Sequence, residues 1–146
     1  MRQALVKIGP WGGNGGNAVD ISVLPDKLIW ITISTTDDVI SSISFRYVGI
    51  DGQEYEPTWG DQTGTAEKIY LGGVEYLKEI SGTYGARPGQ GVMVRSLTFV
   101  TNDNTYEFGI PFGTEFSVPL LGEARVVGFF GRACVRLDAV GIYVHP

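Results

Sequence analysis

Cysteine and histidine are almost absent from this sequence, which contains only Cys134 and His145. One cysteine cannot form an internal disulfide, and one cysteine with one histidine cannot build a usual zinc site. His145 has no serine or cysteine nucleophile near it in sequence, so a catalytic triad is not expected. The adjacent Asp37 and Asp38 are more typical of a surface turn than of a cation site. We therefore expect no enzyme activity, no bound metal and no cofactor.

Long apolar runs and an excess of positive charge are missing as well. No stretch approaches the ~18 apolar residues of a membrane-spanning helix. The segment Met1–Ile8 lacks the apolar core and cleavage site of a signal peptide. With 11 basic against 16 acidic residues, the formal net charge of −5 argues against nucleic acid or an anionic membrane as a partner. We expect a nucleocytoplasmic protein that binds neither nucleic acid nor membrane.

Glycine, in contrast, is abundant, with 21 glycines among 146 residues, about twice the usual ~7%. Such a composition favours many tight turns and hence many short strands. The longest stretch without glycine or proline, Asp26 to Val48, is rich in β-branched residues, which pack well on a pleated sheet. No segment has the pattern of a helix. The sequence predicts an all-β fold in one domain spanning residues 1–146.

Three segments with alternating apolar and polar residues resemble copies of one another. Each of them, at 43–47, 97–99 and 140–144, follows another hydrophobic segment: Leu28–Ser34, Val74–Gly82 and Ala124–Phe130 respectively. A strand pair that occurs three times predicts three small sheets around a shared core, although any all-β chain offers some such pairs by chance. The N-terminal segment Ala4–Ile8 is then expected to complete the third sheet. This pairing would bring residues 12–16 beside the C-terminal hairpin.

The segment Gly12-Gly13-Asn14-Gly15-Gly16 has the composition of a binding loop. Glycines expose bare backbone amides, which suit a small hydroxyl-rich ligand or an anion. A phosphate site of the dinucleotide or P-loop kind needs a helix after the loop, and the residues that follow are too few and too β-branched for one. The segment around Trp59, Thr58–Gly64, resembles a degraded second copy of this loop and supports the repeat.

Asp138 is the one carboxylate in an otherwise apolar strand start, just after a turn at Arg132–Arg136. A carboxylate in that position is costly unless it receives hydrogen bonds. Two interpretations remain open on the sequence alone. The side chain either caps the turn, or it accepts hydrogen bonds from two adjacent hydroxyl groups of a ligand.

The segments Trp11–Gly16, Gly128–Arg132 and Leu137–Val144 together resemble the jacalin-related lectins of plants, and most closely the mannose-specific branch of grasses and other monocots. The resemblance covers essentially the whole chain. It implies the β-prism I fold, in which three four-stranded Greek-key sheets surround a pseudo-threefold axis. It also implies a carbohydrate-binding protein without enzyme activity, whose partners are mannose- or glucose-containing glycans.

The same resemblance implies the sugar site residue by residue. Gly16 offers its amide to ring hydroxyls, the amides of Val135 and Arg136 bind O5 and O6, and Asp138 accepts from the O4 and O6 hydroxyls. The segment from Tyr84 to Gln90 flanks the pocket and tunes which oligosaccharide fits, and the resemblance implies that Tyr84, Gly85, Ala86 and Arg87 form a flanking specificity loop. A shallow site of this kind binds a single sugar weakly, so a homodimer or higher oligomer is expected.

One departure from the family pattern concerns the Gly-x-x-x-Asp motif, whose first position is Cys134 here. If this position needs a positive φ, the cysteine costs on the order of 1 kcal/mol and re-aims the neighbouring amides. We expect a working but weakened site, and the alternative is a β-prism that recruits a protein partner after losing sugar recognition. The corresponding segments of the other repeats, 39–42 and 91–94, carry no aspartate. We therefore predict one sugar site per chain.

Overall fold

The structure, a computed structural model, describes residues 4–146 as thirteen strands. Residues 1–3, which belong to the segment Met1–Ile8 in which we expect no signal peptide, lie outside the described residues. No helix able to cross a bilayer is found between residues 4 and 146. The strands are β1 (Val6–Gly12), β2 (Asn17–Val19), β3 (Pro25–Thr36), β4 (Val39–Gly49), β5 (Glu54–Tyr55), β6 (Thr58–Gly60), β7 (Thr65–Tyr70), β8 (Leu77–Arg87), β9 (Gly91–Thr101), β10 (Thr105–Gly109), β11 (Thr114–Pro119), β12 (Arg125–Ala133) and β13 (Leu137–His145).

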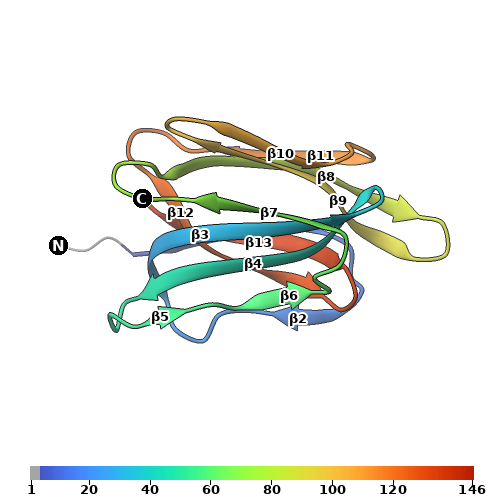
Figure 1. Ribbon diagram of the computed structural model, residues 1–146, viewed down its shortest axis with the longest axis horizontal. Helices are drawn as coiled ribbons and strands as arrows, with labels where there is room; N and C mark the ends of the chain where they lie inside the picture. Colours follow the sequence, from blue (N-terminus) through green and yellow to red (C-terminus); the bar gives the residue numbers. More distant parts are fainter. Residues whose placement is uncertain (1–3) are drawn as a thin grey trace.

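The strands form three antiparallel sheets around one core, which confirms the predicted all-β class (Figure 1). Their orders are β1-β13-β12-β2, β10-β9-β8-β11 and β5-β4-β3-β7. In each sheet a long central hairpin (β12–β13, β8–β9 or β3–β4) is flanked by shorter strands, the Greek-key pattern that the family resemblance implies. The chain's first strand, β1, pairs with its last, β13, as the sequence predicts.

The sheet built on the β3–β4 hairpin has five strands rather than the predicted four, because β5 and β6 both pair with β4. The interruption between them falls at Glu56-Pro57. Proline has no backbone N–H to donate to a ladder, and only its carbonyl takes part, accepting from the Phe45 amide at 3.2 Å. One edge strand is thereby split into two short ones.

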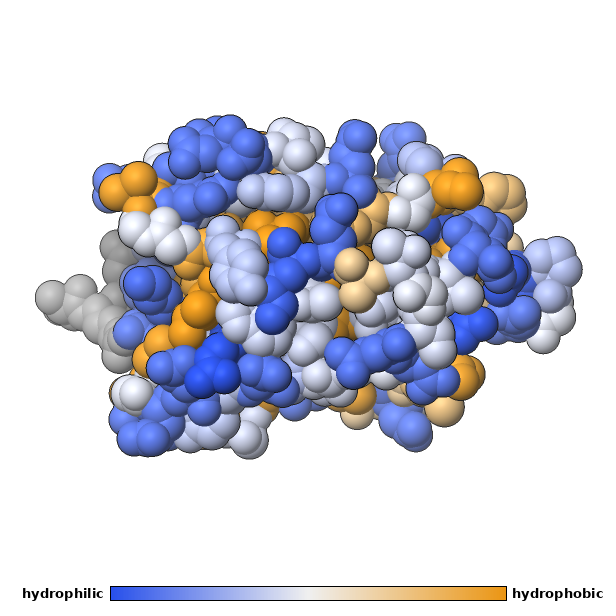
Figure 2. Space-filling view, in the orientation of Figure 1, coloured by the Kyte–Doolittle hydropathy of each residue, from blue (hydrophilic) through white to orange (hydrophobic). Residues whose placement is uncertain are grey.

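The core is built by the inward side chains of the three central hairpins. Phe45 of β4, Phe99 of β9 and Phe129 of β12 are fully buried. The Phe129 ring lies 5.0 Å from that of Phe45 and 6.1 Å from that of Phe99, in edge-to-face geometry. Each sheet thus contributes one aromatic ring to the centre. On the outside, hydrophilic and intermediate side chains cover most of the face formed by β3, β4, β6 and β7, and apolar ones show only in small patches (Figure 2).

A β-bulge near the turn of each central hairpin reveals the threefold repeat at the level of single residues. The bulges lie between Ser34 and Thr35, between Thr83 and Tyr84, and between Arg132 and Ala133. In each case the partner strand carries one extra residue, which is Ser41, Arg95 or Asp138. These three residues therefore occupy equivalent positions, and only one of them is an acid.

Opposite each bulge lies a pair of glycines with positive φ, four residues apart: Gly12 and Gly16, Gly60 and Gly64, Gly109 and Gly113. A Cβ at the first glycine of each pair would lie only 2.1–2.3 Å from the carbonyl oxygen of the extra residue. The close backbone approach explains why glycine is needed there. The structure confirms that the Trp59 segment is a second copy of the first loop, and it adds a third copy at residues 109–113.

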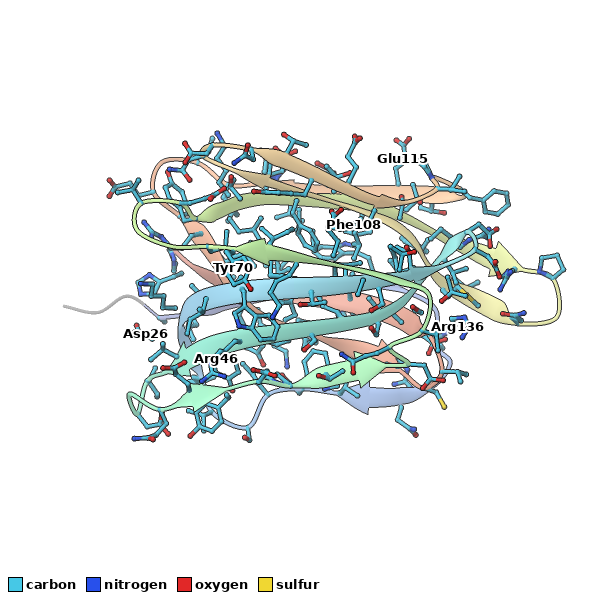
Figure 3. The ribbon with its side chains drawn as sticks, viewed as in Figure 1. Asp26, Arg46, Tyr70, Phe108, Glu115 and Arg136 are labelled. Atoms are coloured by element: carbon cyan, nitrogen blue, oxygen red, sulfur yellow. The ribbon has the colours of Figure 1, made fainter. Side chains whose placement is uncertain are left out.

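The three hairpin turns gather at one end of the molecule, and the start of β1 and the end of β13 lie toward the other end (Figure 1). Arg136, in the β12–β13 turn, marks the turn end in Figure 3.

Candidate functional site

A hollow of about 460 Å³ opens at the turn end, between the β1–β2 loop, the β12–β13 turn and the β8–β9 turn. All four residues predicted to bind sugar line it. The lining residues are Gly15, Gly16, Gln90, Met93, Cys134, Val135, Arg136 and Asp138. Because β1 pairs with β13, and the Gly13 amide donates to the Asp138 carbonyl at 2.9 Å, the loop after the first strand and the start of the last strand meet here.

Gly16 and Asp138 are in direct contact. Gly16 has a φ of +65°, and a Cβ built on it would lie 2.5 Å from Oδ2 of Asp138 and 2.8 Å from the Ala133 carbonyl. At Gly15 the corresponding distance to Oδ1 of Asp138 is 3.3 Å. The glycines therefore leave the space that the carboxylate fills, and they hold the loop backbone beside its oxygens.

Arg132 holds the glycine loop in place through two hydrogen bonds to its backbone. Its Nε donates to the carbonyl of Gly15 at 2.9 Å, and its second terminal nitrogen donates to the carbonyl of Gly16 at 3.0 Å. A planar guanidinium is suited to such a two-point contact. Both loop carbonyls are therefore held by a single side chain. The sequence gives no sign of this contact, because a side-chain bond to a distant carbonyl has no spacing rule.

The Asp138 carboxylate is largely buried, with 9% of the residue exposed. Burial raises its pKa above the ordinary aspartate value, while the positive charge of Arg132 acts in the opposite direction. Within residues 4–146, no group donates a hydrogen bond to this carboxylate. The observation favours the second of the two interpretations of Asp138, because a side chain that capped the turn would accept a bond from it. Its oxygens stay available as acceptors for a ligand.

Cys134 does not have the positive φ that would have strained its backbone. Among the described residues, the only one other than glycine with a positive φ is Asp37, so Cys134 carries no strain of that kind. Its side chain is exposed, and its amide donates to the Arg136 carbonyl at 3.1 Å, which closes the turn. The condition under which the cysteine was expected to weaken the site is therefore not met.

The segment expected to flank the pocket is mostly strand rather than loop. Tyr84, Gly85, Ala86 and Arg87 belong to β8 and pair with β9 from Val94 to Gly91, so the turn itself is only residues 88–90. Gln90 and Met93 reach the hollow, while the four residues from Tyr84 to Arg87 do not line it. Met93 escapes sequence analysis because a buried apolar strand residue is typical of a core. The influence of Tyr84–Arg87 on specificity stays a prediction.

The acidic residues near the hollow do not form a metal site. No cluster of three or more histidine, cysteine, aspartate or glutamate side chains with that potential occurs between residues 4 and 146. What the hollow offers is a set of backbone amides, one partly desolvated carboxylate and some apolar surface from Met93 and Val135. Such a combination suits a neutral molecule with several hydroxyl groups.

Comparisons with known proteins agree with this geometry. A family model described as "Jacalin-like lectin domain" matches residues 8–143. Horcolin from barley (Hordeum vulgare) is 40% identical over 144 residues, covering 97% of each chain. Among solved structures, a mannose-binding jacalin-related lectin from Ananas comosus superposes with a TM-score of 0.91 at 42% identity, over 97% of this chain and 98% of that one. A mannose-specific jacalin-related lectin from Morus nigra, solved with mannose, gives a TM-score of 0.84 at 33% identity, over 99% and 96% of the two chains.

Proposed function

Because the chain belongs to the jacalin-like lectin domain family, we propose that it binds mannose- or glucose-type sugars non-covalently in the hollow between the β1–β2 loop and the β12–β13 turn. Membership of this family also confirms that the protein is a carbohydrate-binding protein rather than an enzyme. The observation that carries the proposed site is the contact between Gly16 and the Asp138 carboxylate, whose oxygens have no donor among the described residues.

The proposed roles follow from the chemistry of the lining. Asp138 accepts hydrogen bonds from the O4 and O6 hydroxyls, Gly16 donates its amide to a ring hydroxyl, and Val135 and Arg136 donate theirs to O5 and O6. A carboxylate that receives two hydroxyl donors recovers the hydration that burial removes. The relatives named for mannose support this choice of sugar.

A site of this kind is weak on its own. A few partly exposed hydrogen bonds give an affinity in the millimolar range, about −4 kcal/mol. We therefore propose that the protein acts as a homodimer or higher oligomer, because several linked sites raise avidity without new contacts. Analytical ultracentrifugation tests this: a species of 15.8 kDa alone at working concentration contradicts it.

The decisive experiment is removal of the carboxylate. The Asp138→Ala variant should pass through a mannose–agarose column that retains the unaltered protein, with its circular dichroism spectrum unchanged. Asp103→Ala, at an exposed aspartate that does not line the hollow, is the matched control and should be retained. Retention of Asp138→Ala refutes the assignment.

The alternative role is a module that recruits a protein partner. It depended on Cys134 disturbing the turn, and the ordinary φ of that residue removes this reason. The same column separates the two functions, because a protein-recruiting module with no sugar site would not be retained even without a substitution.

A further inference from the structure

Asn14 is the one residue of the glycine loop with a reactive side chain, and it takes no part in the proposed sugar contacts. It is exposed and does not line the hollow. Within residues 4–146, neither its side-chain amide nor its backbone carbonyl makes a hydrogen bond, and the N–H of Gly15 has no acceptor. The side chain of Asn14 and the peptide bond to Gly15 are therefore not held by any bonding partner of their own.

Asn14-Gly15 is also the only Asn-Gly pair in the sequence. Asparagine is one of the chemically labile residues, and a glycine after it leaves the backbone nitrogen accessible because glycine has no side chain. A Cβ built on Gly15 would have only Asp138 near it, with Oδ1 at 3.3 Å and Cγ at 3.8 Å. Apart from Asp138 and the chain neighbours, no described residue comes within 4 Å of that position. The Gly15 nitrogen can therefore approach the side-chain carbonyl carbon of Asn14.

The reaction that this approach permits needs water as its only co-reactant. The deprotonated nitrogen of Gly15 bonds to Cγ of Asn14, and the bond from Cγ to Nδ2 breaks. The leaving nitrogen takes up the proton that Gly15 has lost and departs as ammonia, so that a five-membered succinimide remains. Water then opens this ring. Opening at Cγ gives aspartate, whereas opening at the backbone carbonyl gives isoaspartate, in which the chain runs through Cγ and the former backbone carbonyl becomes a free carboxylate.

The loop is fixed on both sides of Asn14, so it has no slack for a longer backbone. On one side, the Gly13 amide donates to the Asp138 carbonyl at 2.9 Å. On the other side, Arg132 holds the carbonyls of the next two residues at 2.9 and 3.0 Å. Isoaspartate inserts one extra carbon between these anchors, which lengthens the backbone by about 1.5 Å. A displacement of about 1 Å is enough to disable a binding site.

We propose that Asn14 is a site of spontaneous modification, at which conversion to isoaspartate disables the sugar hollow as the protein ages. The consequence, loss of sugar binding, rests on the proposed function, whereas the modification itself depends only on Asn14 and Gly15. Glycan binding should therefore decline with the age of each protein molecule.

The modification is tested by incubating the unaltered protein at mildly alkaline pH and mapping its peptides by mass spectrometry. The peptide with Asn14 should gain the mass difference between an amide and an acid, and it should become a substrate for protein isoaspartyl methyltransferase. Asn102 is the internal control, because its Oδ1 accepts from the Tyr76 amide at 2.9 Å and its Nδ2 donates to the Val74 carbonyl at 2.8 Å. Modification at Asn102 before Asn14, or at neither, overturns the proposal.

The consequence is tested by passing the incubated protein over mannose–agarose. The unretained chains should carry isoaspartate at position 14, and the retained chains should carry asparagine or aspartate there. Treatment with the methyltransferase and S-adenosylmethionine returns isoaspartate to aspartate through the same succinimide, so it should restore retention of the unretained chains. Equal amounts of isoaspartate in the two fractions would overturn the loss of binding.

Two variants separate the longer backbone from other causes. Asn14→Gln cannot form the five-membered ring, so it should still be retained after the same incubation. Freshly prepared Asn14→Asp has the added charge but the original backbone length, and it should be retained as well. Loss of retention by either variant contradicts the role of isoaspartate. If the fresh, unaltered protein is not retained, the proposed function has failed, while peptide mapping still decides the modification, so the two failures are distinguishable.

Discussion

Gly16 and Asp138 lie far apart in the sequence and yet are in contact: the space that a Cβ on Gly16 would need is taken by Oδ2 of Asp138, 2.5 Å away. The contact arises because β1 and β2 flank the β12–β13 hairpin in one sheet. Loop backbone and carboxylate therefore form one continuous surface of the hollow, and a change on either side disturbs the other.

Gly16→Ala should abolish sugar binding and destabilise the fold by about 1–3 kcal/mol, because the new methyl group meets both Asp138 and the Ala133 backbone at a positive φ. Calorimetry of unfolding and titration with methyl α-mannoside measure the two effects. Gly52→Ala is the control: its φ is +81° but no atom lies within 4 Å of the new Cβ. It should cost about 1 kcal/mol of backbone strain alone and keep the sugar affinity. Equal sugar affinity in both variants would contradict the steric argument.

Asp138→Asn should abolish sugar binding and raise the melting temperature at neutral pH. Burial raises the pKa of Asp138 in the folded state, so the folded form holds the proton more tightly than the unfolded form. The stability that the bound proton adds to the fold is fully present below the pKa that Asp138 has in the unfolded chain. It is lost as the pH rises through the higher pKa that Asp138 has in the folded protein. An asparagine never ionises and avoids this loss. Thermal unfolding from acid to neutral pH should show the advantage of the variant shrinking toward acid. If Asp138→Asn is less stable than the unaltered protein at neutral pH, folding does not raise the pKa of Asp138 and the argument fails.

Arg132→Lys should lower the sugar affinity by roughly three- to tenfold, because an ammonium cannot donate to the Gly15 and Gly16 carbonyls in the same two-point geometry. The loop amides would then lose their fixed direction while the charge near Asp138 is kept. Titration with methyl α-mannoside measures the effect. Arg125→Lys, at an arginine outside the hollow, is the control and should bind normally. Normal binding by Arg132→Lys would show that the loop keeps its shape without the two guanidinium hydrogen bonds.

Cys134→Gly should leave the sugar affinity within about twofold of the original, because Cys134 has no positive φ to relieve. The added backbone freedom of glycine should cost up to about 1 kcal/mol of stability through the unfolded chain. Titration and thermal unfolding check both effects. A clear gain in affinity would mean that the cysteine side chain crowds the turn after all.

Each chain should bind one sugar. The residues equivalent to Asp138 are Ser41, whose hydroxyl donates to the Thr63 carbonyl at 3.1 Å, and Arg95, which is occupied by Asp38 and by backbone carbonyls. Neither position offers a free carboxylate. Titration with a monosaccharide at high protein concentration should give a stoichiometry near one, and a value near two is incompatible with this assignment.

The sequence predicts the architecture well because the repeated features are local. Alternating apolar residues and β-branched runs mark the central hairpins, and the pairing of β1 with β13 follows from the missing partner of the last hairpin. The meeting of Gly16 with Asp138 follows in turn. The third glycine pair, Gly109 and Gly113, is hidden because the residues between its members are Ile110, Pro111 and Phe112, which do not resemble the first loop.

Side-chain contacts between segments far apart in the sequence are what sequence analysis could not supply. The bonds from Arg132 to the loop carbonyls, and the ion pairs of Asp38 with Arg87 and Arg95, join residues whose spacing follows no periodic rule. The φ of Cys134 depends on how the β12–β13 turn closes, and its motif position alone could not show whether the condition for strain is met. These contacts and the turn conformation determine the local geometry around the hollow, not the order of strands in the sheets.

The pairing of β1 with β13 also sets an order of events during synthesis. The opening strand stays unpartnered on the ribosome until the segment through His145 has emerged. The hollow, which needs residues of both the β1–β2 loop and the β12–β13 turn, forms only once this sheet closes, and the glycan binding proposed for it can begin only then.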